Sequence, residues 1–72
     1  MRYTLKQLSY FVAAGEHGSI TGAAQAIHVS QASISAALGH LEAVLGVQLF
    51  VRRHAKGLSL TPAGRDLLGE AR

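Results

Sequence analysis

Residues Thr21–Gly46 are T-G-A-A-Q-A-I-H-V-S-Q-A-S-I-S-A-A-L-G-H-L-E-A-V-L-G, a short helical pattern, a turn and a longer helical pattern. Apolar residues recur every three or four positions on both sides of His28-Val29. Ser30 is the predicted N-cap of the longer helix, because its side chain can accept a bond from an otherwise unpaired backbone N–H. Two helices joined by so short a connection form a helix-turn-helix.

The longer helix, over residues 31–45, has one leucine-rich side and one side of small residues. The spacing predicts that the core-facing side chains are Ile34, Leu38, Leu41 and Leu45. The outward-facing positions are then Ala32, Ser35, Ala36 and Gly39. A solvated helix face usually carries Lys and Glu, and residues 31–41 have neither. This favours a contact surface over the alternative of a plain solvated face.

Helical patterns flank this pair on both sides. A first helix is predicted over residues 4–17, with Thr4 as its N-cap, and it supplies apolar surface for the pair. Either Ser19 or Thr21 can cap the helix that follows, and Ile20 would form a hydrophobic staple if the cap is Thr21. Thr61-Pro62 is a strong start signal for a fourth helix that runs to residue 72.

Two apolar runs predict a β-hairpin between the third and fourth helices. They are Val47–Val51 and Leu58–Leu60, and the hydrophobic side chains expected to fix them on the core are Leu49, Leu58 and Leu60. A two-stranded hairpin needs such packing to be stable. The polar connection between the runs carries a basic cluster, Arg52, Arg53 and Lys56.

Composition limits the class of protein. Seventy-two residues make one small domain, and the absence of cysteine excludes disulfides and thiolate metal sites. No apolar run is long enough to span a membrane, and the start is not a signal peptide. The net charge of +3 is unevenly distributed, because residues 17–41 and 43–65 contain no acid. A basic cluster without nearby acids attracts phosphates.

Catalytic and metal chemistry are not expected. The four histidines, at 17, 28, 40 and 54, match no zinc-site spacing. Paired acids, a nucleophile–base spacing and a glycine-rich phosphate loop are all missing from the sequence. The serines at 30, 33 and 35 fall at a helix start, where caps and contacts are the expected roles. The sequence therefore predicts a protein that is not an enzyme.

Three blocks, in this order, carry a family resemblance: G-S-I-T-G-A-A-Q-A-I-H-V-S-Q-A-S-I-S, then L-E-A-V-L-G-V-Q-L-F-V-R, then L-T-P-A-G. Over roughly residues 5–68 the chain resembles the N-terminal domain of LysR-type transcriptional regulators. The resemblance implies a mainly α fold, the winged helix-turn-helix, with a three-helix core, a two-stranded β-hairpin wing and the start of a C-terminal linker helix. Residues 4–61 would be the DNA-binding domain, and residues 62–72 would begin the linker and dimerisation helix.

The resemblance also implies partners and a location. It implies sequence-specific binding of double-stranded DNA by a bacterial, cytoplasmic regulator, at an operator with interrupted palindromic symmetry. Homodimers or homotetramers would form through the linker helix. No cofactor is expected in this domain, and a C-terminal effector domain outside these residues would bind a small-molecule inducer. Because the chain stops inside a helical pattern, we expect a longer protein.

The family's recognition helix usually opens with S-Q-P-x-L-S-R. Ser30, Gln31, Ile34 and Ser35 match this pattern, whereas Ala32 replaces the usual Pro and Ala36 the usual Arg. The change at position 36 removes a long donor that would reach a phosphate or a guanine edge. The resemblance therefore supports the docking mode more strongly than any one base contact.

The expected DNA contacts lie on two elements. The helix pair contributes Thr21, Ser30, Gln31, Ala32, Ser33, Ser35, Ala36 and His40. The basic wing, residues 52–57, contributes Arg52, Arg53, His54 and Lys56. The recognition helix, residues 31–45, would enter the major groove, where glutamine can bond bidentately to adenine and alanine can touch thymine methyls. Wing cations would contact the backbone or the minor groove.

Two questions stay open in the sequence. A winged-helix module that binds protein instead of DNA is the alternative function, since the outward helix face is small and the net charge modest. Leu67 and Leu68 of the fourth helix need a partner surface, which is either a second copy of the chain or the first helix of the same copy.

Overall fold

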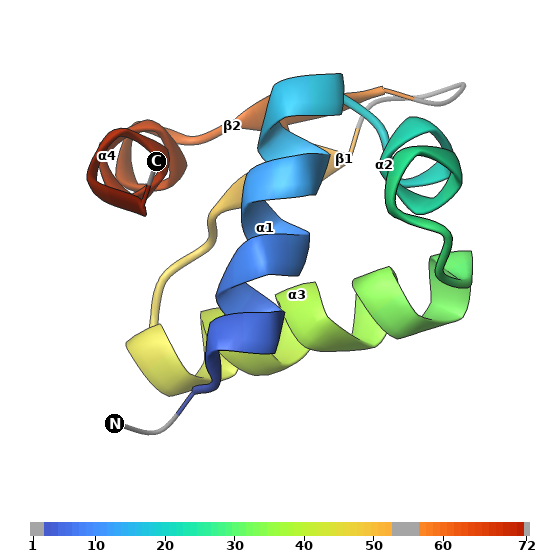
Figure 1. The fold of residues 1–72 in the computed structure, drawn as a ribbon. Coiled ribbons are helices and arrows are strands. Elements are labelled where there is room, and N and C mark those ends of the chain that lie inside the picture. Colours follow the sequence, from blue (N-terminus) through green and yellow to red (C-terminus); the bar gives the residue numbers. More distant parts are fainter. Residues whose placement is uncertain (1–2, 53–56, 72) are drawn as a thin grey trace.

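The computed structural model describes residues 3–52 and 57–71, and its order of elements is that of a winged helix-turn-helix (Figure 1). The elements are α1 (Leu5–His17), α2 (Ile20–Ile27), α3 (Gln31–Leu45), β1 (Phe50–Arg52), β2 (Leu58–Leu60) and α4 (Pro62–Ala71). The predicted fold class, mainly α with one hairpin, is confirmed.

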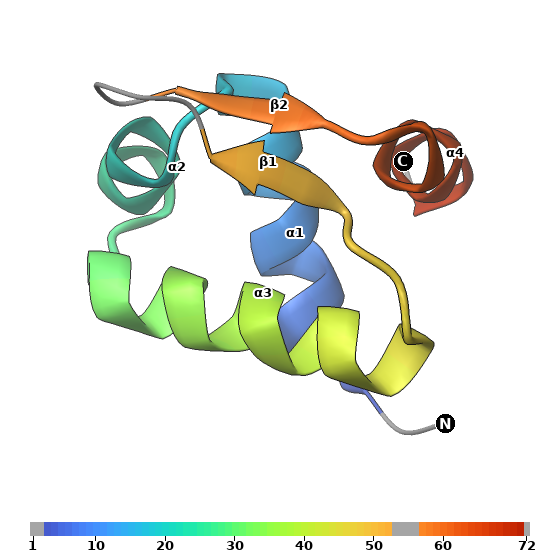
Figure 2. The same cartoon turned by 180° about the vertical axis from the view of Figure 1, so that it is seen from behind.

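Helix α1 is the central element of the fold. It contacts α2, α3 and α4, and the hairpin lies against it in the view from behind (Figure 2). Thr4 forms a capping box, in which its hydroxyl accepts from the Gln7 N–H and the Gln7 side chain accepts from the Thr4 N–H. Gly18 ends the helix at φ 68°, a left-handed conformation that glycine adopts without a Cβ clash.

Helix α2 begins one residue after Ser19, which settles the choice of its cap. The Ser19 hydroxyl accepts from the Gly22 N–H at 2.9 Å, so Thr21 lies in the first turn and Ile20 is itself helical. The staple considered for Ile20 therefore does not form in that position. Ala23 and Ala24 are buried, and their small side chains let α2 approach its neighbours closely.

The hairpin is antiparallel, with Phe50 opposite Leu60, Val51 opposite Ser59 and Arg52 opposite Leu58. Its first strand starts three residues later than predicted from Val47. The reason is that its partner strand ends at Leu60, where Thr61 caps α4, so the residues before Phe50 have no strand opposite them in the described part of the chain. The Leu49 N–H bonds instead to the Glu42 carboxylate at 2.8 Å. Leu49 is buried as predicted, and Leu58 and Leu60 pack against the core.

Helix α4 packs on α1 of the same chain. Leu68 is 5% exposed, and a Cβ built on Gly15 would lie 3.0 Å from one of its methyl carbons. Leu67 also packs against the core, half-buried. Of the two partner surfaces considered for this helix, the structure places Leu68 on the intramolecular one.

The core lies where α1, α2 and α3 meet the hairpin. Its largest fully buried side chains are Phe11, Ile34, Leu41 and Leu49. The prediction for Leu45 is wrong, because this side chain is 38% exposed. Leu45 belongs to the final turn of α3, just before Gly46 ends the helix, and too little of the fold packs over that turn to cover it. Among the described residues no helix is long and apolar enough to cross a membrane.

Candidate nucleic-acid interface

The turn between α2 and α3 is formed by a left-handed residue and by two backbone hydrogen bonds to one carbonyl group. His28 ends α2 in the left-handed conformation, with φ 60° and ψ 46°, and its N–H bonds to the Ala24 carbonyl. The Val29 N–H bonds to the same carbonyl at 3.1 Å. The chain thus reverses within three residues and delivers Ser30 to the start of α3. Of the described residues outside glycine, His28 alone has a positive φ.

Ser30 caps α3, as predicted. Its hydroxyl oxygen accepts from the Ser33 N–H at 3.0 Å, and its O–H donates to the Ser33 hydroxyl oxygen at 2.8 Å. Both serines are exposed, so the capped end of the helix faces solvent. The Ser33 hydroxyl keeps its own proton for a further partner, because in this bond it acts as the acceptor.

The inner side of α3 is sealed. Ile34, Leu38 and Leu41 are at most 4% exposed, and Ala37 is 7% exposed. Along the first three turns of α3, the side opposite these buried residues is therefore the one that is accessible to another molecule. The orientation predicted for α3 is therefore correct for Ile34, Leu38 and Leu41 and wrong for Leu45.

The outer side of α3 presents small or short polar side chains to solvent. The exposed residues are Gln31, Ala32, Ser33, Ala36, Gly39 and His40. A Cβ built on Gly39 would meet no other atom within 4 Å. Ser35 is half-buried and lies at the edge of this face. We call this set, residues 31–33, 36, 39 and 40, the outer face of α3.

Thr21 lies on α2 and is exposed, in the first turn after the Ser19 cap. Helices α2 and α3 are in contact (Figure 1). The first turns of both helices thus belong to one helix-turn-helix unit, and their exposed polar groups are available to an external partner.

The basic cluster lies mostly outside the described residues. Arg53, His54 and Lys56 fall there, and Arg52 is described as a backbone position of β1 opposite Leu58. Both ends of this connection are fixed by described contacts. The Leu58 N–H bonds to the Gly18 carbonyl at 2.9 Å, and the Phe50 ring packs on Phe11.

Sequence reasoning missed the part that Glu42 takes in holding the hairpin. One carboxylate oxygen accepts from the Leu49 N–H at 2.8 Å and from the Phe50 N–H at 3.2 Å. The available signal was that Glu42 is the single acid between residues 17 and 65. Among the described residues, no group of three or more histidine and acidic side chains could hold a metal ion.

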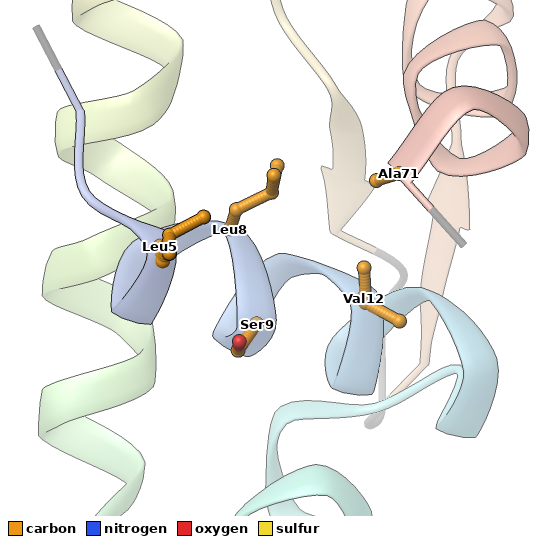
Figure 3. Close-up of a pocket in the computed structure, with 5 residues that line it drawn as sticks. All are labelled: Leu5, Leu8, Ser9, Val12 and Ala71. Atoms are coloured by element: carbon orange, nitrogen blue, oxygen red, sulfur yellow. The ribbon is translucent and has the colours of Figure 1, made fainter. Parts of the chain in front are cut away.

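An apolar pocket lies on another side of the molecule, between the first turns of α1 and the end of α4. Figure 3 shows the residues that line it, which are Leu5, Leu8, Ser9, Val12 and Ala71. Leu5 is 77% exposed, the most exposed large hydrophobic side chain of the described residues.

The comparisons with known proteins agree on one family. Residues 5–65 match the family model described as "Bacterial regulatory helix-turn-helix protein, lysR family". The HTH-type transcriptional regulator TfdS of Cupriavidus pinatubonensis is 48% identical over 67 residues, and ClcR of Pseudomonas putida is 46% identical over 67 residues. Each alignment covers 93% of this chain and 22% of the relative, so the chain spans about a fifth of their length.

Solved structures with the same fold include complexes with DNA. The crystal structure of the CbnR_DBD-DNA complex superposes with a TM-score of 0.91 at 45% identity, covering 96% of this chain and 78% of that one. The BenM_DBD/catB site 1 DNA complex gives a TM-score of 0.87 at 35% identity, covering 94% of this chain and 74% of that one.

Proposed function

Because this chain belongs to the lysR family of bacterial regulatory helix-turn-helix proteins, we propose that it binds double-stranded DNA sequence-specifically as the DNA-binding part of a transcriptional regulator. The observation that carries the proposal is the two-sided construction of α3. Its apolar side is buried in the core, and its outer face is exposed and has no acidic side chain. A helix of this kind fits the major groove of B-DNA.

On this outer face, Gln31 is the main candidate for contacts to bases. It sits in the first turn of α3, where recognition helices meet base edges, and its amide can bond bidentately to adenine. Ala32 and Ala36 offer methyl groups to thymine, while Ser33 and Ser35 offer hydroxyls that discriminate weakly. Such a surface suits half-sites rich in A·T pairs.

Phosphate contacts surround this base-reading turn. On the helix pair, we assign them to Thr21 at the start of α2, to Ser30 at the start of α3 and to His40 farther along α3. In the wing, residues 52–57, we assign them to Arg52, Arg53, His54 and Lys56, because clustered cations without nearby acids attract the DNA backbone. These contacts would add affinity and register with little sequence preference.

The rest of the protein's action is also proposed. Residues 4–61 would form the DNA-binding domain, and α4 would begin a linker helix through which copies pair. The apolar pocket beside Ala71, with its exposed Leu5, gives a second copy apolar surface to cover. Paired copies would fit an operator with interrupted palindromic symmetry. A small-molecule inducer would bind an effector domain outside these residues. We propose that the chain itself binds DNA and does not catalyse a reaction. Its location would be the bacterial cytoplasm.

Salt-dependent binding to duplex DNA tests the proposal. Each neutralised phosphate should contribute a slope of roughly −0.9 to log K against log salt. Arg53→Ala should weaken binding to all duplexes and flatten the slope, whereas Lys6→Ala removes an equal charge from the exposed first turn of α1 and should change neither. Gln31→Ala should cost about 1–3 kcal/mol at the selected site and little at random sites.

Two outcomes would count against this function. If the chain binds duplexes with no salt dependence, or does not bind them, the alternative of a protein-binding winged helix gains support. If Gln31→Ala lowers cognate and random binding equally, Gln31 does not read bases.

A further inference from the structure

Helices α3 and α4 both make hydrogen bonds to the segment between them, Gln48–Phe50. From the α3 side, one oxygen of Glu42 accepts from the N–H groups of Leu49 and Phe50, at 2.8 and 3.2 Å. From the α4 side, the Thr61 hydroxyl donates to the Gln48 carbonyl at 2.6 Å, and the Thr61 N–H donates to the Leu49 carbonyl at 3.0 Å. Within these three residues, the N–H groups of Leu49 and Phe50 thus bond to α3, and the carbonyl groups of Gln48 and Leu49 bond to the start of α4.

Packing makes this shared segment rigid. The side chains of Leu49 and Phe50 are 1% and 7% exposed, so the segment cannot shift without opening the core. On the α4 side, a Cβ on Gly64 would overlap the Leu49 carbonyl oxygen, which means that the two backbones are already in contact. Both views show α4 beside α1 and the chain that enters β1, away from α3 (Figure 1, Figure 2). The segment therefore supplies a direct link between these two helices.

We infer that Glu42 and Thr61, through the Gln48–Phe50 segment, fix the angle between α3 and α4, and thereby the separation at which two copies place their α3 helices on DNA. The consequence for DNA rests on the proposed function, in which α3 reads bases and α4 pairs two copies. In that arrangement, half-site spacing is a geometric property of the dimer. Glu42 and Thr61 are then positioning residues that set the preferred spacing without touching DNA.

The angle is measured on the 72-residue chain by spin-label distances. The sequence has no cysteine, so Ala43→Cys on α3 and Asp66→Cys on α4 provide two unique, exposed attachment sites. The parent should give one narrow distance peak. Glu42→Ala removes both bonds from the α3 side and should lose that narrow peak. Thr61→Ala removes the hydroxyl bond to Gln48 but keeps the backbone bond to Leu49, and should broaden the peak.

The controls separate positioning from stability. Glu42→Gln keeps an oxygen that can accept both N–H bonds, and Thr61→Ser keeps the hydroxyl, so both should retain the narrow peak. Thr4→Ala is the matched control, because Thr4 caps α1 as Thr61 caps α4, while the hydroxyl of Thr4 bonds to Gln7. Circular dichroism checks that each variant is folded. A narrow peak in folded Thr61→Ala, or equal broadening in Thr4→Ala, overturns the inference.

The DNA consequence is measured with duplexes that carry two half-sites, whose spacing varies by single base pairs over one helical turn. The parent should prefer one spacing, and the preference should fall toward none in Glu42→Ala while persisting in Glu42→Gln. Equal spacing preference in the parent and in folded Glu42→Ala overturns the consequence. If the parent binds no duplex, the proposed function fails, while the spin-label distances still decide whether the segment fixes the angle.

Discussion

The ring of Phe11 in α1 lies against the ring of Phe50 in β1, with centroids 5.4 Å apart and planes tilted by 60°. Aromatic pairs prefer tilted arrangements of this kind over a parallel sandwich. Both residues are buried, at 0% and 7% exposure. The pair therefore joins the hairpin to the central helix at the first residue of β1, two residues before the basic wing.

We expect the two rings to stabilise the fold cooperatively. Phe11→Leu and Phe50→Leu should each lower the free energy of unfolding, and a double-mutant cycle should give a coupling of about 0.5–1.5 kcal/mol. Urea unfolding of the parent, both single variants and the double variant measures it. Phe50→Leu combined with Ser30→Ala, at a distant cap, should be additive. A coupling near zero for the ring pair would show that it contributes by burial alone.

Gly64 and Gly69 should respond to alanine in opposite directions, although both lie in α4. A Cβ on Gly64 would overlap the Leu49 carbonyl oxygen, so Gly64→Ala should cost about 1–3 kcal/mol as the backbones separate. A Cβ on Gly69 meets nothing within 4 Å, so Gly69→Ala should add about 0.5–1 kcal/mol. Chemical unfolding measures both. Stabilisation by Gly64→Ala would contradict the close approach of α4 to the Gln48–Phe50 segment.

His28 should tolerate asparagine but not valine. Its φ of 60° is left-handed, a conformation that asparagine visits readily and that β-branched residues avoid. His28→Val should therefore lower the free energy of unfolding by about 1–2 kcal/mol, and His28→Asn should change it little. Because the side chain is exposed, lost packing does not account for such a difference. Equal unfolding free energies for the two variants would show that the turn relaxes to another conformation.

Local signals allowed much of this fold to be predicted from the sequence. Ser30, Gly46 and Thr61 mark helix ends through bonds to residues three or four positions away, and all three predictions are confirmed. The helix periodicity also identified the sealed side of α3. Such signals are readable because both partners lie in the same short stretch of chain.

Features that depend on distant residues were not predictable in the same way. Leu45 continues the apolar stripe of α3, yet its exposure depends on what lies over the last turn. Strand β1 starts at Phe50 instead of Val47 because its partner strand ends at Leu60, where Thr61 caps α4. Neither fact is a property of the local pattern. The DNA contacts of Gln31 and Arg53 remain predictions.

Ala36 offers the sharpest test of how α3 is used. It is exposed on the outer face, where related recognition helices often carry arginine, so a long side chain can be added without disturbing the core. Ala36→Arg should strengthen binding by about 1–3 kcal/mol at half-sites with a guanine facing this turn, since arginine pairs bidentately with guanine O6 and N7. Gly69→Arg adds the same charge on α4 and is the matched control. Binding-site selection followed by affinity titration separates the two. If both variants strengthen binding to all duplexes equally, the added charge acts at long range and the outer face of α3 does not lie in the groove.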